Sequence, residues 1–177
     1  MIAELKIRYA AIEAKRQVVF ELLYGLSADQ TTFRVGPGRW SILMVLEHVV
    51  IAEEIVLADI QAGRAEPAGS APKSPEAFHR VIKALEKDIP MEVPLPELEP
   101  TGVVSLDDLI VRWEAARTGL RQALEKIPPE TLTTPICRHP VGGPMDARES
   151  IEFFAVHLDH HRRQVRRIGE TFSKIRT

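Results

Sequence analysis

Four long segments of the chain repeat apolar residues at intervals of three and four, and breakers separate the segments. The first covers about residues 2–26, where Leu5, Ile12 and Val19 follow this spacing. The interval matches the 3.6 residues per turn of an α-helix and gives each segment one apolar face. No segment alternates regularly enough to predict a strand. The pattern therefore predicts an all-α fold.

Capping residues and breakers predict where the next two helices lie. A Gly-Pro-Gly run at 36–38 ends the first link, and Ser41 then has the place of an N-cap for a second long helix that reaches about Ala62. Residues 63–74 are rich in Ala, Gly, Pro and Ser and predict a loop. Ser74 followed by proline predicts a short helix from there to about Asp88.

The second half of the chain has the same organisation. A proline-rich connector at 90–100 is expected to be extended. A capping-box pattern at 105–108 opens a third long helix to about Lys126. Residues 131–144 are expected to form a loop. A second capping box, Asp146-Ala147-Arg148-Glu149, opens the last long helix, which is predicted to end near Ile168 with Gly169 as its stop.

Four amphipathic helices of this length predict an antiparallel four-helix bundle formed by one domain, residues 1–177. The short extra helix would lie in the long connection between the second and third long helices. A chain of 177 residues can bury a sizeable core without covalent staples. Cys137 is the only cysteine, so an internal disulfide is excluded.

Composition narrows the classes of function. The formal net charge is −2, whereas nucleic-acid binders usually carry a basic excess, so no nucleic-acid partner is expected. Four arginines between 162 and 167 lie near the predicted C-terminal end of a helix, where they are expected to form a solvated face. Charged residues interrupt the most apolar segment, 42–60, so no membrane partner is expected. The N-terminus lacks the pattern of a signal peptide, which predicts a cytoplasmic protein.

Histidines are concentrated on two of the predicted helices. His157 and His161 lie four residues apart, so their side chains fall on the same helical face. The apolar stripe of that helix places His161 near its middle and His157 at its edge, whereas His160 should face solvent or the rim. His48 has only apolar helical neighbours and should point into the bundle.

Each histidine considered alone would more often be a hydrogen-bonded core residue than a ligand. Three inward imidazoles from two helices change this interpretation, because an uncharged polar cluster is costly to bury unless something organises it. A metal ion does so, and neutral imidazole is a ligand for zinc, nickel, copper and iron. The sequence therefore predicts a metal site at His48, His157 and His161.

Several other residues have both an ordinary structural explanation and a functional one. Trp40 is expected to pack as a hydrophobic staple against the helix that it precedes, with pocket lining as the alternative. Cys137 is expected to be structural rather than nucleophilic, since no base is evident beside it. His139 is expected to shape a turn or to approach the mouth of the site. Glu53 and Glu54 are expected to form a surface pair, although Glu53 could support the site.

Short motifs give the chain a family resemblance. Arg39-Trp40-Ser41 followed by Glu47-His48 resembles the start of the second helix in the DinB-like superfamily. The segment from His139 to Pro144, and then His157-Leu158-Asp159-His160-His161-Arg162-Arg163-Gln164, resembles the closing loop and last helix of that family. Each motif is short, but the order and separation of the motifs follow the family's layout from the first helix to the last.

The resemblance implies a four-helix bundle with a metal site of three histidines, which map onto His48, His157 and His161. It also implies a homodimer. Some members of the superfamily are S-transferases or isomerases that use a low-molecular-weight thiol, and many have no known activity. No residue in this chain selects a particular thiol or acceptor.

Two functions from different classes follow from these expectations. The first is a metal-dependent enzyme, either a thiol-dependent transferase or a hydrolase, that acts on a small-molecule substrate. The second is a non-catalytic bundle that binds a metal or a small ligand. A structural protein in which the histidines are core residues is a third hypothesis. The cofactor expected is one divalent metal ion, zinc or nickel first, with iron and manganese as alternatives.

Overall fold

The computed structural model describes residues 1–63, 74–89 and 92–175, and most of these residues are helical. The predictions of a loop at 63–74 and of an extended connector from Pro90 thus fall partly outside the described residues. The elements, in chain order, are α1 (Ala3–Leu23), α2 (Ala28–Thr32), α3 (Ile42–Ala62), α4 (Pro75–Glu86), η1 (Pro96–Leu98), α5 (Leu106–Glu125), η2 (Pro129–Thr131), β1 (Cys137–His139), β2 (Gly143–Met145) and α6 (Ala147–Ile175).

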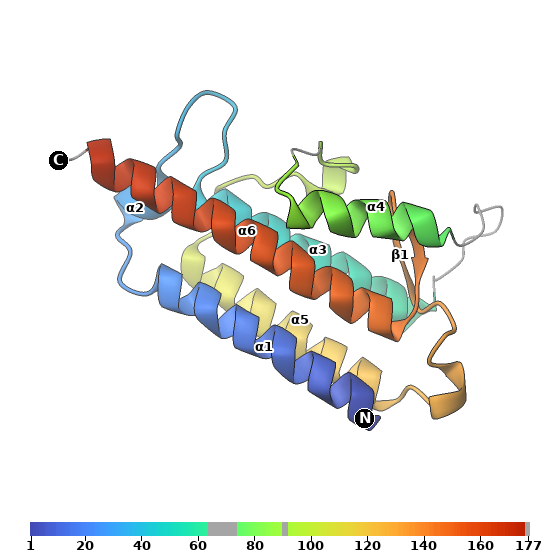
Figure 1. Cartoon of the computed structure of the whole chain (residues 1–177). Helices are drawn as coiled ribbons and strands as arrows, with labels where there is room; N and C mark the ends of the chain where they lie inside the picture. Colours follow the sequence, from blue (N-terminus) through green and yellow to red (C-terminus); the bar gives the residue numbers. More distant parts are fainter. Residues whose placement is uncertain (64–73, 90–91, 176–177) are drawn as a thin grey trace.

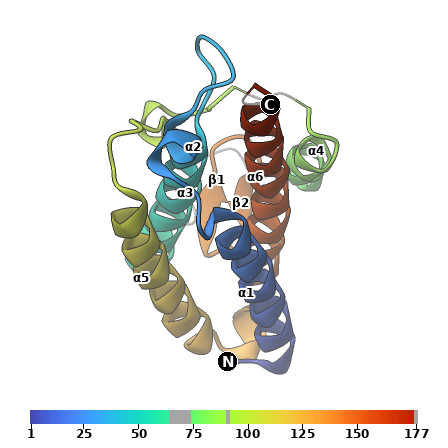
Figure 2. The ribbon, with the colours of Figure 1, turned by 90° about the vertical axis from the view of Figure 1, so that its left-hand side faces the viewer.

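Four long helices, α1, α3, α5 and α6, lie side by side, and α4 packs on the outer side of α6 (Figures 1 and 2). The prediction of an all-α fold is confirmed. Figure 1 also shows that α1 and α6 run in one direction, whereas α3 and α5 run in the other. Within each of these two contacting pairs the helices are thus parallel. The reason lies in the long connection after α3, which returns the chain to the end where α3 began before α5 starts.

Side-chain caps begin the helices where the sequence predicted. The hydroxyls of Ser41, Ser74 and Ser105 each accept a hydrogen bond from the backbone N–H three residues later. At the start of α6 the backbone N–H of Glu149 donates to Asp146, and the N–H of Asp146 donates to the Glu149 carboxylate, both at 3.0 Å. These reciprocal bonds form the expected capping box.

Two predicted helix ends are wrong. The first helix stops at Leu23 instead of Leu26, because Gly25 adopts a positive φ of 75° and turns the chain. Ser27 then opens the separate short helix α2 with its own capping box. At the other end of the chain, α6 continues through Gly169 to Ile175. A glycine stops a helix efficiently where it takes the left-handed conformation, and Gly169 has no positive φ.

A small β-hairpin lies where the sequence predicted a loop. β1 and β2 pair antiparallel, with Cys137 opposite Met145 and His139 opposite Gly143. Strands of three residues are too short to show a period of two, so no alternation was available to predict them. The hairpin packs against α3 and joins directly to the start of α6.

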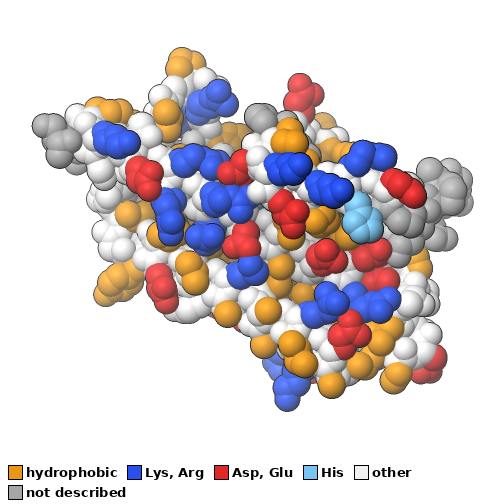
Figure 3. Space-filling model, viewed as in Figure 1, with side chains coloured by type: hydrophobic (Ala, Val, Ile, Leu, Met, Phe, Trp, Pro, Cys, Tyr) orange, Lys and Arg blue, Asp and Glu red, His pale blue; other side chains and the backbone are white. Residues whose placement is uncertain are grey.

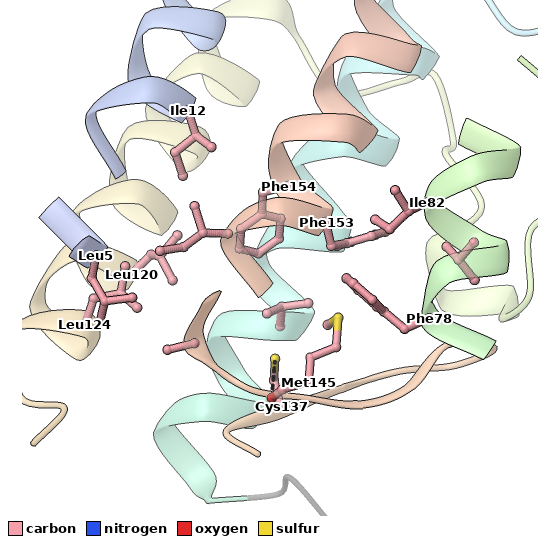
Figure 4. Packing of buried hydrophobic residues seen from close by; sticks show 14 of the residues in the cluster. Leu5, Ile12, Phe78, Ile82, Leu120, Leu124, Cys137, Met145, Phe153 and Phe154 are labelled. Atoms are coloured by element: carbon pink, nitrogen blue, oxygen red, sulfur yellow. Dashed lines mark hydrogen bonds between the residues drawn. The ribbon is translucent and has the colours of Figure 1, made fainter. Parts of the chain in front are cut away.

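Two clusters of buried hydrophobic residues form the core. The first joins α1, α4, α5, the hairpin and the N-terminal half of α6, and Figure 4 shows Phe153 of α6 facing Phe78 and Ile82 of α4. The second joins the C-terminal half of α1 to α3, α5 and the later turns of α6. Among the helices of the described ranges, none has the length and apolar composition needed to cross a bilayer.

The bundle also buries an ion pair. Glu53 accepts hydrogen bonds from Trp113 Nε1 at 2.9 Å and from Arg117 Nη2 at 2.6 Å. Both members of the Glu53–Arg117 pair are almost fully buried. The prediction that Glu53 and Glu54 both lie at the surface is therefore wrong for Glu53. Glu54 lies near the surface, where it pairs with Arg112. Glu53 instead ties α3 to α5.

Candidate metal centre

His48 of α3 and His157 and His161 of α6 converge in the interior of the molecule. One ring nitrogen from each lies within 4.8 Å of one from each of the others. The three side chains are only 6–7% exposed. The contact between α3 and α6 brings them together, and the one-turn spacing of the α6 pair places its two imidazoles on one face, where they meet edge-on.

Oxygen acceptors fix the orientation of two of the three imidazoles. His48 Nδ1 donates to the carbonyl oxygen of Leu98 at 2.8 Å, and His161 Nδ1 donates to Gln164 Oε1 at 2.9 Å. A neutral imidazole has one N–H, so these bonds leave Nε2 of both rings unprotonated, as a metal ligand must be. Metal-binding histidines usually have such a partner on the second nitrogen.

The protonation state of the three imidazoles also suits the binding of a cation. Burial lowers the pKa of His157 and His161 well below the ordinary histidine value, and neighbouring imidazoles lower it further. Burial lowers the pKa of His48 as well. All three rings are thus neutral at pH 7. The Nε2 atoms of His157 and His161 lie 3.0 Å apart, close to the spacing of about 3.3 Å that two nitrogens have around a tetrahedral zinc ion. The donor set fits a divalent metal.

Aromatic rings enclose the three histidines. Trp40 lies 4.9 Å from His48 and 6.4 Å from His161, measured between ring centroids. Phe153 stacks on His157 at 5.0 Å with an interplanar angle of 21°. Trp40 was expected mainly as a staple for α3. It packs against the second hydrophobic cluster, which includes the first turns of α3, and its ring also lies beside two of the site histidines.

His139 is outside the three-histidine group but lies near it. Its ring contacts Phe153 edge-on at 4.8 Å, on the ring that stacks on His157. Its Nδ1 accepts hydrogen bonds from the backbone N–H groups of Val141 and Gly142, at 3.1 and 2.8 Å. His139 therefore shapes the hairpin turn, as the sequence predicted. Burial lowers its pKa to about 4.

His160 lies at the rim, outside the three-histidine group, and its ring meets that of His161 edge-on at 4.9 Å between centroids. Its Nδ1 is 2.8 Å from a carboxylate oxygen of Asp88, just after α4. The same carboxylate accepts from Arg163 and Arg167, and these bonds hold its pKa below the ordinary aspartate value. Arg163 and Arg167, two of the four arginines between 162 and 167, thus join α6 to the residue that follows α4. Figure 3 shows acidic side chains interspersed among the basic ones on this face.

Cys137 cannot serve as a ready nucleophile. The residue is fully buried in the first hydrophobic cluster, and Figure 4 shows its sulfur beside Met145. Burial raises the pKa of its thiol to about 12, so the thiolate is scarce at neutral pH. The structural role expected for Cys137 agrees with this placement.

The candidate centre offers three protein donors. Within residues 1–63, 74–89 and 92–175, the group that could hold an ion comprises His48, His157 and His161 and has no fourth His, Cys, Asp or Glu. Structural zinc sites usually have four protein ligands, whereas catalytic sites have three and keep one place for water or substrate. The three protein donors of this centre match the number found in catalytic sites.

A family model matches most of the chain. The model of the DinB superfamily matches residues 11–165, a range that includes all three histidines. The chain belongs to the DinB superfamily. No curated protein matches the sequence at a significant level. Membership in the DinB superfamily confirms the resemblance that the motifs around Trp40, His48 and His157 indicated.

Sequence reasoning missed the groups that orient the imidazoles. Gln164 follows His161 by three residues, so helical spacing could have paired them. The Leu98 carbonyl is 50 residues from His48 and belongs to the backbone, which leaves no trace in the sequence. Phe153 precedes His157 by four residues, so its place beside that ring follows from the i, i+4 spacing on α6.

Proposed function

We propose that the protein is a four-helix-bundle metalloenzyme that binds one divalent ion through Nε2 of His48, His157 and His161 and uses a low-molecular-weight thiol as a co-substrate. The observation that carries this proposal is the convergence of three neutral imidazoles, two of which have Nδ1 bound to an oxygen acceptor. The thiol rests on membership in a superfamily that includes thiol-dependent transferases.

A divalent cation held by three neutral ligands would supply Lewis acidity, which lowers the pKa of a thiol or of water that shares the site. The protein's own contribution is to hold the imidazoles unprotonated and oriented. Trp40 and Phe153 cover the histidines with apolar surface, which limits access of water. In the reaction proposed, the thiol gives its proton to solvent, its sulfur forms a bond to an electrophilic carbon of the acceptor, and the leaving group departs with the electron pair of the bond that breaks.

Elemental analysis tests the metal-binding part of the proposal. Protein purified without a polyhistidine tag should contain close to one equivalent of a divalent metal, with zinc or nickel expected first. A triple variant with His48, His157 and His161 all replaced by alanine should contain none. Equal metal content in the two proteins would overturn the site, and absence of metal from both after reloading with Zn²⁺ would favour core histidines.

Thiol binding separates an enzyme from a non-catalytic binding protein. Cobalt-substituted protein should change its visible absorption spectrum when a small thiol is added, because a sulfur donor near the ion alters the spectrum. The triple variant supplies the control. A spectrum insensitive to thiols would remove the thiol from the proposal. Binding of thiol without turnover of any electrophilic acceptor would favour the non-catalytic function.

A further inference from the structure

The backbone segment that follows η1, residues 98–102, bonds to α3 at two neighbouring residues. The carbonyl oxygen of Leu98 accepts from His48 Nδ1 at 2.8 Å. The residue before His48, Glu47, accepts from the Thr101 hydroxyl at 2.8 Å and from the Gly102 N–H at 2.6 Å. Residues 98–102 are called the connector strap below.

The hydrogen bonds of the Glu47 carboxylate lead to the connector strap. Glu47 is only 2% exposed, although a carboxylate is costly to bury without strong partners. Both of its oxygens accept hydrogen bonds, and both donors belong to the connector strap. Its partners are thus 54 and 55 residues away in the chain, outside α3.

The connector strap is also shaped to lie close to α3. Gly102 has a positive φ of 73°, and a Cβ atom added there would lie 2.9 Å from Cγ of Met44. Met44 is one turn before Glu47 on α3. The Thr101 hydroxyl accepts in turn from the Val103 N–H at 3.2 Å, which tightens the turn. Leu98 is buried as well, so the strap is anchored at both ends.

We propose that Glu47 is a positioning residue for the metal centre: it holds the connector strap against α3, so that the Leu98 carbonyl keeps the His48 imidazole protonated at Nδ1 and unprotonated at Nε2. This inference rests on the proposed metal site. It assigns to Glu47 an action through His48, without contact with the ion. Partners of this kind typically change metal affinity by 10- to 100-fold.

Nitrogen NMR of the imidazoles tests the orientation without any metal. In metal-free wild-type protein at pH 7.5, His48 should show a protonated Nδ1 and an unprotonated Nε2. In Glu47→Leu the strap loses its two hydrogen bonds to residue 47, and His48 should become a mixture of tautomers. His161 provides an internal control, because Gln164 and not the strap holds its Nδ1. A matched variant, Gln164→Leu, should alter His161 and leave His48 unchanged.

Zinc affinity, measured by competition with a chelator, gives the second readout. Glu47→Leu should bind Zn²⁺ 10- to 100-fold more weakly than wild type. Glu47→Gln should recover most of the loss, because its amide oxygen can accept from Gly102 while its NH₂ donates to the Thr101 hydroxyl. Thr101→Val removes one of the two hydrogen bonds between the strap and Glu47 without altering α3, and it should lower zinc affinity less than Glu47→Leu does. It also keeps the test decisive if Glu47→Leu does not fold.

The outcomes separate the two proposals. If zinc affinity and the His48 tautomer are the same in wild type, Glu47→Leu and Thr101→Val, the positioning role of Glu47 is wrong, whereas the metal site stands. If wild-type protein binds no zinc but the His48 tautomer changes in Glu47→Leu, the strap orients His48 and the proposed metal function fails.

Discussion

Individual side chains set the chemistry of the centre through burial and hydrogen bonding. His160 and His161 are adjacent in the chain, yet the ring of His161 faces the interior and that of His160 faces Asp88. The difference follows from the rotation of about 100° per residue in a helix. His160, which lies outside the three-histidine group, is therefore a suitable control in tests of metal binding.

Single alanine replacements should separate ligands from neighbours. His48→Ala, His157→Ala and His161→Ala should each lower zinc affinity by at least about 100-fold, because two ligands remain on the ion. His160→Ala should leave zinc affinity within about threefold, since its Nδ1 bonds to Asp88. Chelator competition measures both. If His160→Ala abolished binding while His161→Ala did not, the assignment of the α6 ligands would be incorrect.

The acid dependence of stability should reveal His139. Its pKa is about 4 in the folded protein, below the ordinary value of about 6.5. Between these values the unfolded chain binds a proton that the folded protein does not, so stability falls as the pH falls. The loss is about 2 kcal/mol from pH 6.5 to pH 5. His139→Asn keeps an acceptor for Val141 and Gly142 but cannot titrate.

Urea unfolding at pH 7.5 and pH 5 tests this dependence. Wild-type protein should lose about 2 kcal/mol more than His139→Asn over this interval, since the other buried histidines are common to both. Equal losses in the two proteins would mean that the His139 ring is not kept neutral by the hairpin.

At the scale of helices, two glycines inside helices have opposite surroundings. Gly169 of α6 has no atom near the place of a Cβ, whereas a Cβ on Gly119 of α5 would lie 2.6 Å from Cδ2 of Leu57 on α3. Glycine weakens a helix interior by about 0.5–1 kcal/mol relative to alanine. Open space should therefore let this gain appear at Gly169, while packing of α5 against α3 should oppose it at Gly119.

Alanine at the two glycines gives a matched pair of variants. Gly169→Ala should raise the free energy of unfolding by about 0.5–1 kcal/mol. Gly119→Ala should lower it by about 1 kcal/mol, because Leu57 must move away from its packed place. Thermal unfolding measures both. Destabilisation by Gly169→Ala would show that α6 does not continue as a helix through this residue in solution.

For the whole molecule, the core should suffice to keep the fold when the ion is absent. Two hydrophobic clusters extend along all four long helices, and the Glu53–Arg117 pair joins α3 to α5 apart from the histidines. A chain of this length buries enough surface to fold without a metal. The ion is therefore expected to add stability to an already folded bundle.

Stripping the ion tests this expectation. Chelated protein should keep its helical circular dichroism, and its melting temperature should rise with added Zn²⁺. The gain should follow mass action, about 3 kcal/mol at a free zinc concentration 100 times the dissociation constant. The triple histidine variant should melt at the same temperature with and without zinc. Loss of helix on chelation would make the centre a structural staple.

Local and periodic features were accessible from the sequence. Helical spacing and caps at Ser41, Ser105 and Asp146 predicted where the long helices begin, and the i, i+4 spacing with the apolar stripe selected His157 and His161 over His160. These features depend on residues within one or two turns of each other, and such interactions are the same in any fold. The convergence of His48 with the α6 pair, inferred from inward faces, has the geometry that the sequence suggested.

Only the tertiary structure decided the features that depend on distant parts of the chain. The direction of α5 relative to α3 follows from a connection of more than forty residues, whose path no local pattern fixes. Burial of Glu53 required Trp113 and Arg117 from α5, 60 and 64 residues away. The orientation of His48 depends on a backbone carbonyl at Leu98 and on a strap that Glu47 holds. A backbone carbonyl is identical at every residue, so only folding determines which one meets the imidazole.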